Sequence, residues 1–257
     1  MLDTDPQRND LWAYGLSLLE GQGENEDIVN WVTRGLKALP EDPVLLKKEA
    51  EIQWHDFYAI RAIKKIKKVV RKTDGWLEAL KLFLRWQLEH GDWDNAKSAF
   101  EAFVGDKKPN LRPQFMQLFI DSGDGFREEQ SVKQPLFELG MPQFFDFPVR
   151  SNESILRLRL DPVNEYSVVK VWGVRLTDHK NSEIHIELAS SNAIDSHGDL
   201  HYFATKDGQL YFKGLNLKKF NASRMIVCVD FLYLGANALE QCVKQMQPET
   251  QQAMTLE

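Results

Sequence analysis

Apolar residues follow a helical spacing in the first half of the chain and an alternating spacing in the second. Up to about residue 120 they recur every three or four positions, which predicts helices at 9–21, 25–38, 43–55, 58–72, 76–90, 93–104 and 112–121. From about residue 135 the period becomes two, which predicts strands at 144–150, 156–160, 167–176, 184–188, 200–204, 209–213 and 224–234. Residues 236–247 then predict a closing helix. The pattern therefore indicates an α+β protein with two unlike domains.

The helical half repeats itself. The apolar positions return after 34 residues, in the registers Trp12/Leu46/Leu80, Leu16/Ala50/Leu84, Ile28/Ala62/Ala96 and Val32/Ile66/Phe100. A 34-residue pair of helices resembles the tetratricopeptide (TPR) repeat, as do the turn at 91–96 and the ending 36–40. Gly15 departs from the pattern, because a packed side chain is usual there. The resemblance implies a TPR-like α-solenoid over 1–125, with repeats 9–42, 43–76 and 77–110 and a capping helix at 111–122.

Such a stack leaves a concave surface free for partners. At the positions that line this surface in the family, the sequence has Lys47, Glu51, Lys81 and Arg85. The resemblance implies that a protein partner binds there. The alternative is that these are solvated charges on a spacer, since exposed helix faces are ordinarily charged.

One predicted helix carries a concentrated positive charge. Residues 1–56 contain five basic and twelve acidic residues, whereas 57–73 contain no acid and the basic patch Arg61, Lys64, Lys65, Lys67, Lys68, Arg71 and Lys72. The isoleucines and valines of this segment form one apolar stripe, so the helix is amphipathic. We expect a solvated helix that faces the acidic first repeat. The alternative is peripheral contact with anionic lipid head groups or with an acidic partner.

The second half predicts an antiparallel β-sandwich, jelly-roll-like, over 144–247 with its C-terminal helix, after a linker at 126–143 and before a disordered tail at 248–257. The alternation slips at Trp172–Gly173, which indicates a β-bulge. The runs 155–162, 168–176, 191–193 and 211–212 resemble the β-sandwich accessory domain of bacterial glycosyltransferases and methyltransferases that build surface polysaccharides. The resemblance implies a non-catalytic module that positions an enzyme or contacts glycan. Aromatic candidates for glycan contact are Trp172, Tyr202 and Tyr211.

Few residues suggest chemistry of their own. His197, Asp199 and His201 would share one face of an extended strand and could hold a transition metal, although Gly198 makes a polar turn the favoured interpretation. Asp92-Trp93-Asp94 falls in a turn between predicted helices, where the repeat already accounts for it. We found no nucleophile elbow, Cys-x-x-Cys or His-Glu-x-x-His run, and therefore predict no catalytic residues, no cofactor and no metal site.

Composition adds limits on partner and compartment. The 257 residues have a formal net charge of −6, which argues against a general nucleic-acid binder. No apolar run approaches the roughly 18 residues of a membrane span, and the acidic start is unlike a signal peptide. Two cysteines, Cys228 and Cys242, fit a reducing compartment better than a disulfide framework. We expect a cytoplasmic bacterial protein.

Together these features predict a non-catalytic adaptor or accessory protein of surface-polysaccharide biosynthesis, such as O-antigen or capsule. Its repeats would bind a protein, and its sandwich would contact an enzyme or glycan. The alternatives are a carbohydrate-binding module and a non-catalytic region of a larger glycosyltransferase.

Overall fold

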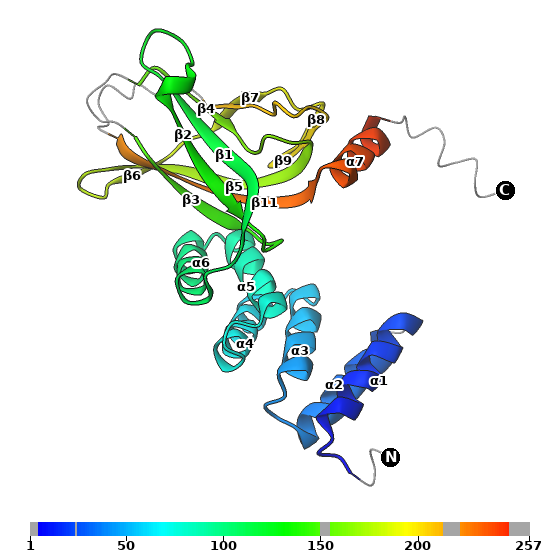
Figure 1. The fold of residues 1–257 in the computed structure, drawn as a ribbon. Helices are drawn as coiled ribbons and strands as arrows, with labels where there is room; N and C mark the ends of the chain where they lie inside the picture. The colour runs from blue at the N-terminus through cyan, green and yellow to red at the C-terminus, as the bar shows by residue number, and fades with distance from the viewer. Residues whose placement is uncertain (1–4, 24, 150–154, 213–221, 247–257) are drawn as a thin grey trace, which may run out of the picture. The chain divides into compact units, whose positions relative to one another are not determined.

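The structure is a computed structural model, which describes residues 5–23, 25–149, 155–212 and 222–246. It shows an α+β protein whose chain divides into two compact units, Met1–Ala99 and Phe100–Glu257 (Figure 1). We call them the helical unit and the two-sheet unit. The predicted disordered tail at 248–257 lies outside the described residues.

Consecutive antiparallel helices make up the helical unit and continue to Lys107. They are α1 (Asn9–Gln22), α2 (Asn25–Ala38), α3 (Pro43–His55), α4 (Ala59–Lys72), α5 (Leu77–Glu89) and α6 (Trp93–Lys107). Local sequence explains several boundaries. Asp42 caps α3 by accepting a hydrogen bond from the Leu45 amide at 2.9 Å, and Pro43 fits the first turn. Gly23 ends α1 with a φ of 78°, in the left-handed region that favours glycine.

Burial confirms the 34-residue register. All positions of the four predicted registers, from Trp12 to Phe100, are buried. The departure at Gly15 has a packing reason, because a Cβ there would collide with the ring of Trp31 on α2. The indole nitrogen of Trp31 donates to the Trp12 carbonyl oxygen at 3.0 Å. The first helix pair therefore fills this position with Trp31 of its second helix.

The two-sheet unit contains antiparallel strands in two sheets. The strands are β1 (Leu111–Asp121), β2 (Ser131–Phe137), β3 (Gln143–Pro148), β4 (Arg157–Asp161), β5 (Ser167–Asp178), β6 (Glu183–His185), β7 (Leu188–Ser191), β8 (Asp195–His197), β9 (Leu200–Phe203), β10 (Leu210–Phe212) and β11 (Ala222–Leu234), with a short 3-10 helix η1 (Glu128–Gln130). One sheet has the order β2-β1-β4-β10-β7, and the other has β3-β11-β5-β9-β8 with β6 also on β5.

One apolar core lies between the sheets. Leu118, Leu160 and Leu210 reach it from the first sheet, and Phe147 and Val227 from the second. These residues come from alternating positions, so the period of two was a sound guide to the buried face. The predicted bulge is confirmed: Cys228 pairs with Gly173 and Val229 with Val171, which leaves Trp172 as the extra residue.

The predicted capping helix at 111–122 is wrong, because this segment is strand β1. The run from Phe115 to Ile120 is apolar enough to suit either spacing. Its hydrogen-bonding partners decide: Leu118 pairs with Val132 of β2 and with Leu160 of β4. The predicted linker at 126–143 is wrong for the same reason, since it contains η1 and β2. The sheets therefore begin at 111 rather than 144.

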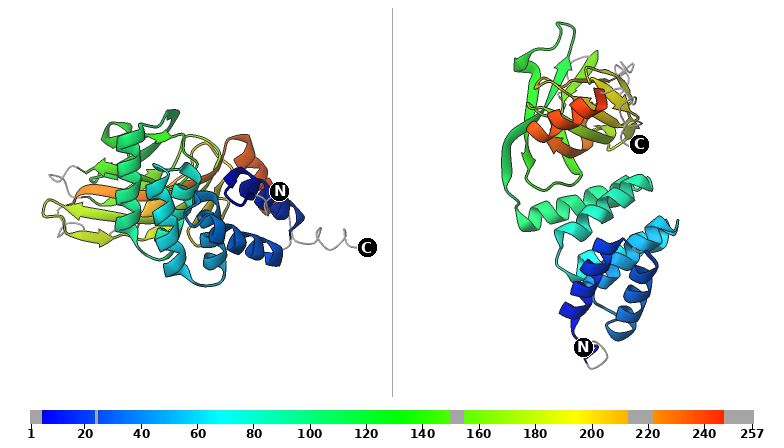
Figure 2. Two further views of the ribbon diagram at one scale, coloured as in Figure 1. Left: turned by 90° about the horizontal axis from the view of Figure 1, so that it is seen from below. Right: turned by 90° about the vertical axis from the view of Figure 1, so that its right-hand side faces the viewer.

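The end of the described chain matches the prediction more closely. Helix α7 (Ala236–Met246) occupies most of the expected 236–247 and lies on the outside of the two-sheet unit (Figure 2). Ala238 and Cys242 pack against Val168 and Tyr202. Cys228 and Cys242 are both buried and form no disulfide.

Candidate functional site

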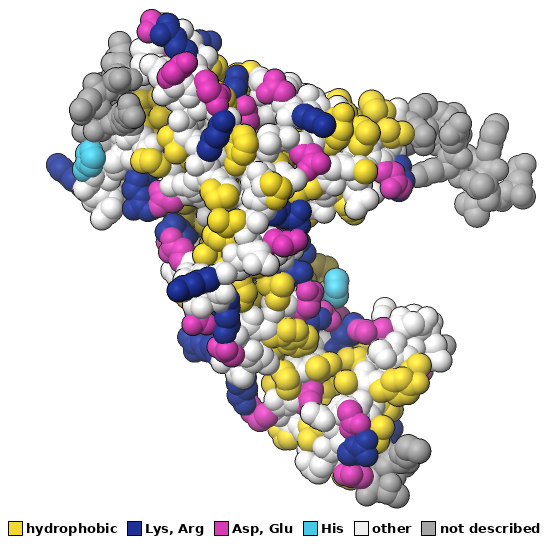
Figure 3. Space-filling model, viewed as in Figure 1, with side chains coloured by type: hydrophobic (Ala, Val, Ile, Leu, Met, Phe, Trp, Pro, Cys, Tyr) yellow, Lys and Arg dark blue, Asp and Glu magenta, His cyan; other side chains and the backbone are white. Residues whose placement is uncertain are grey.

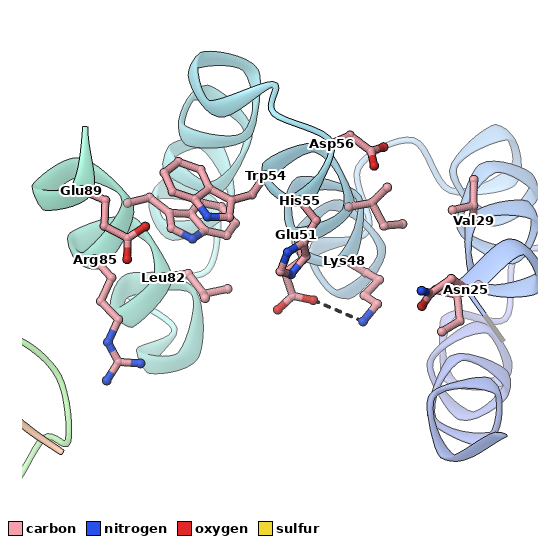
Figure 4. A pocket seen from close by; sticks show the side chains of 13 residues that line it. Asn25, Val29, Lys48, Glu51, Trp54, His55, Asp56, Leu82, Arg85 and Glu89 are labelled. Atoms are coloured by element: carbon pink, nitrogen blue, oxygen red, sulfur yellow. Dashed lines mark ion pairs between the residues drawn. The ribbon is translucent and has the colours of Figure 1, made fainter. Parts of the chain in front are cut away.

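The helical unit contains a cavity of about 620 Å³. It is lined by side chains of α2, α3 and α5 and of the residue after α3: Asn25, Ile28, Val29, Lys48, Glu51, Ile52, Trp54, His55, Asp56, Leu82, Arg85, Trp86 and Glu89. Figure 4 shows α3 in the middle, with Asn25 and Val29 on one side and Leu82, Arg85 and Glu89 on the other. The cavity therefore spans successive helix pairs.

The lining follows the 34-residue repeat. Helix α3 contributes positions 48, 51, 52 and 55, and helix α5 contributes 82, 85, 86 and 89, each of them 34 residues later. Within each helix the later three positions lie three, four and seven residues after the first, which places all four side chains on one face. The repeated register thus presents the same helix face to the cavity twice.

Two of the four residues expected on a concave surface line this cavity, namely Glu51 and Arg85. Lys47 pairs with Glu51 at 2.6 Å, and its ammonium nitrogen stands 5.9 Å from the ring centroid of Trp76. Lys81 pairs with Glu78 at 2.8 Å. The lining positions missed from sequence, such as Lys48 and Leu82, each lie one residue further along. The signal that could have found them is the buried register itself, which fixes the rotation of each helix.

The floor of the cavity is aromatic. The rings of Trp54 and Trp86 stack with centroids 4.8 Å apart and planes 9° apart. Trp86 is buried and Trp54 half-buried. Ile52 and Leu82, both half-buried, add aliphatic surface beside the rings. A floor of this kind accepts an apolar side chain of a ligand.

The rim carries charges of both signs. Lys48 pairs with Glu20 at 2.7 Å and with Glu51 at 3.5 Å. Its partial burial would lower the pKa of Lys48, but the two carboxylates outweigh that effect and raise it. Arg85 and Glu89 add charge from α5. The mixed rim favours a ligand with polar groups around an apolar anchor, as in a peptide, over a simple polyanion.

The basic patch on α4 is partly neutralised within the helical unit. Lys65 pairs with Glu49, and Lys68 and Lys72 both pair with Glu41. Glu41 belongs to the acidic first repeat that α4 was expected to face, whereas Glu49 lies on α3 of the same repeat as α4. The other basic residues of the patch, Arg61, Lys64, Lys67 and Arg71, form no ion pair among the residues that the structure describes. Figure 3 shows Lys and Arg side chains along the edge of the helical unit where α4 runs.

The three aromatic candidates for glycan contact do not come together. Trp172 is half-buried in β5, and the Lys170 ammonium stands 3.5 Å from its ring centroid. Tyr202 packs under α7, and burial raises the pKa of its phenol. Tyr211 lies in the other sheet, with its ring centroid 6.0 Å from that of Phe126.

A turn separates the two histidines of the weak metal candidate, His197 and His201. Gly198 and Asp199 join β8 to β9 as a tight hairpin, so His197 pairs with Leu200 and Ser196 with His201. This pairing places the two imidazoles on opposite faces. His201 is buried and contacts the Ser196 hydroxyl at 2.9 Å, whereas His197 contacts Asp195 and Gln245. Within the described ranges, no three His, Cys, Asp or Glu residues are placed to hold a metal ion.

Sequence comparisons add no relative: neither a protein-family model nor a curated protein matches the chain. Among the helices that the structure describes, none is long and apolar enough to span a membrane. The geometry of the cavity is consequently the basis for assigning a function.

Proposed function

We propose that the protein is a non-catalytic adaptor whose TPR-like repeats hold a peptide segment of a protein partner in the cavity between α2, α3 and α5. The observation that carries the proposal is the repeated lining register, in which positions 48, 51, 52 and 55 recur as 82, 85, 86 and 89. A repeat that presents one face again and again suits an elongated ligand. The stacked tryptophans supply the apolar contact, and the charged rim supplies orientation.

We place this adaptor in the assembly of a bacterial surface polysaccharide, where the two-sheet unit would rest on an enzyme or on glycan. Support comes from the resemblance of 155–176 and its neighbours to accessory domains of polysaccharide enzymes. Strands β4 and β5 lie in that run. Under this proposal the protein is cytoplasmic and needs no cofactor.

Selection of a displayed random-peptide library on the full chain tests the adaptor role. We expect the selected peptides to share an apolar anchor and to bind at least about ten-fold more weakly to Leu82→Arg, because a charge on the cavity floor is costly to bury. Circular dichroism checks that the variant is folded. If no peptide is enriched, or if the enriched peptides bind the variant equally well, the adaptor proposal is wrong.

The charged rim offers a matched pair of variants. Lys48→Glu reverses a charge inside the cavity, and Lys81→Glu makes the same change at a position outside its lining. We expect the first to weaken peptide binding and the second to leave it unchanged. Equal effects would indicate that binding occurs elsewhere on the helical unit.

A second candidate function, glycan binding, is favoured by a row of side chains across the first sheet. Arg159 of β4 pairs in register with Phe119 of β1 and with Tyr211 of β10, so the three share one face. The Arg159 guanidinium stands 3.9 Å from the ring centroid of Phe119 and forms an ion pair with Asp161. Phe119 is buried, so the ring that could face a sugar is the half-buried Tyr211, beside these charged hydrogen-bonding groups.

A glycan array probed with the full chain tests this second function. A fragment that begins after β1 would be a poor probe, because it lacks a strand of this sheet. We expect Tyr211→Ala to abolish any signal and Trp172→Ala to keep it, since only Tyr211 belongs to the row. An array without signal, or one equally sensitive to both changes, argues against a glycan site on this face.

A further inference from the structure

The turn between α3 and α4 differs from the corresponding turns of the other helix pairs. The 34-residue register places Phe57 at the position of Gly23 and Gly91. All three have a positive φ, of 65°, 78° and 81°. A left-handed backbone is strained for any residue with a Cβ and is most costly for a bulky one. The second pair therefore carries a phenylalanine where its own backbone favours glycine.

Folding gains nothing from the side chain of Phe57, which is 96% exposed. Its neighbours Tyr58 and Ile60 are 54% and 69% exposed. We call these three residues the apolar tip. Neither backbone geometry nor core packing accounts for an aromatic residue here. Strain and exposed apolar surface together mark a place where a partner supplies the missing contact.

The charge that follows the tip is also inverted relative to the other pairs, although Asp56 just before the tip stands where the others have Gln22 and His90. Where the second pair has Ile60 and Arg61, the first has Glu26 and Asp27 and the third has Asp94 and Asn95. Acidic residues are favoured in the first turn of a helix, yet α4 has none there. The second pair therefore departs from its neighbours in a direction that helix stability does not explain.

Basic side chains continue from the tip along the outer face of α4. Arg61, Lys64 and Arg71 are exposed and lie three and seven residues apart, on one face of the helix. None of the three forms an ion pair with a described residue. The apolar stripe of the same helix, including Ile66 and Val69, is buried. Lys68 lies between Lys64 and Arg71 on the same face and pairs with Glu41. The tip is thus followed by three exposed basic residues without an ion pair, with the paired Lys68 among them.

We infer that the α3–α4 turn is a docking site for an anionic lipid surface. The apolar tip inserts among the head groups, and Arg61, Lys64 and Arg71 contact their phosphates. Each part alone binds a bilayer weakly, and stable peripheral binding takes both an apolar and an electrostatic contribution. A row of like charges beside apolar side chains of three different shapes complements a fluid anionic surface better than one protein pocket. The inference is independent of the peptide cavity, whose lining contains no residue of this site.

Co-sedimentation of the full chain with vesicles tests the inference. We expect binding to vesicles of phosphatidylcholine mixed with phosphatidylserine, little binding to phosphatidylcholine alone, and weakening by salt. Replacing Arg61 or Lys64 by Gln should lower the partition coefficient by about five-fold each. Phe57→Gly should lower it by more than about ten-fold.

Phe57→Gly separates loss of binding from loss of stability, because it removes the aromatic ring and also relieves the strained backbone. Its unfolding temperature should be unchanged or higher, so lost binding would not reflect unfolding. Tyr233→Ala is the matched control, since Tyr233 is another exposed aromatic residue at 44% exposure. This control should bind like the unaltered protein.

Three results would overturn the inference. One is failure to sediment with the anionic vesicles at low salt. Another is unchanged binding by Phe57→Gly, which would leave charge alone responsible. The last is binding to soluble polyglutamate that is as tight as binding to vesicles and equally sensitive to Phe57→Gly, because the site would then serve an acidic protein.

Discussion

Trp54 on α3 and Trp86 on α5 stack across two successive helix pairs, with ring centroids 4.8 Å apart. They differ in burial, since Trp86 is 5% exposed and Trp54 is half-buried. The stack therefore joins the core of the helical unit to the floor of its cavity.

Removing these rings should have unequal costs. We expect Trp86→Ala to lower the free energy of unfolding by about 3–5 kcal/mol, because it opens a cavity in a packed site. Trp54→Ala should cost about 1–2 kcal/mol, because its side chain is already partly exposed to water. Urea denaturation followed by circular dichroism measures both. Equal losses would contradict the packing described for the stack.

Gly15 should not tolerate a methyl group. In an exposed helix, Gly→Ala gains about 1 kcal/mol. At Gly15 the added Cβ meets the Trp31 ring, so we expect Gly15→Ala to destabilise the protein by about 1–3 kcal/mol. Gly21 on the same helix has nothing within 4 Å of such a Cβ. Gly21→Ala is therefore the control, and thermal unfolding should show a small gain; a gain at both positions would argue against the Trp31 contact.

Asp161 should make stability fall as pH rises. Burial raises its pKa to about 6 from 3.8, against the opposing effect of Arg159. Between these values the folded protein holds a proton that the unfolded chain has lost, so this contribution is present below pH 4 and is lost by pH 6. Asp161→Asn should flatten that part of the pH profile, by at most about 3 kcal/mol. Denaturation at a series of pH values measures the effect.

Asp121 provides the opposite case for comparison. Burial works against its ionised form, but the amides of Gly123 and Gly125 and the guanidinium of Arg157 outweigh it and lower the pKa of Asp121. Its contribution is therefore present above the unfolded pKa and is lost as pH falls below that value. Asp121→Asn should alter the stability profile only below about pH 4, the unfolded pKa of an aspartate. If both variants change the profile over the same pH range, these assignments are wrong.

Gln143 should contribute strongly to stability through its contact with the end of β2. Its side chain is buried and accepts from the Phe137 amide at 2.9 Å while donating to the Phe137 carbonyl at 2.9 Å. The side-chain amide of Gln143 thus satisfies both backbone groups of Phe137. We expect Gln143→Leu to cost about 2–4 kcal/mol, because both backbone groups lose their partner in a buried site.

Gln114→Leu is the control for that prediction. Gln114 donates to Glu165 at 2.8 Å from a half-buried position, where water can take its place. Its loss should cost less than about 0.5 kcal/mol in the same urea experiment. Similar costs for the two variants would mean that the Gln143 pairing contributes little.

Several elements were predictable because their sequence periods are unambiguous. The run 167–176 alternates except at Trp172–Gly173, and that slip marked a real bulge. Strand β1 was not predictable in this way, since its apolar run fits a helix or a strand until Val132 and Leu160 are in place beside it. The alternation over 184–188 predicted a single strand, but the structure divides this region between two sheets, with β6 on β5 and β7 on β10.

The sequence by itself determined the 34-residue register, the type of most elements and the concentration of positive charge on one helix, because spacing and charge are local properties of the chain. Only the tertiary structure decided the rest. Packing rotated α3 and α5 so that Lys48 and Leu82, rather than Lys47 and Lys81, line the cavity. The hairpin at Gly198 separated His197 from His201. Long-range pairing with Glu41 and Glu49 neutralised part of α4 and left three basic residues beside the apolar tip unpaired within the described chain, and no single stretch of sequence contains those contacts.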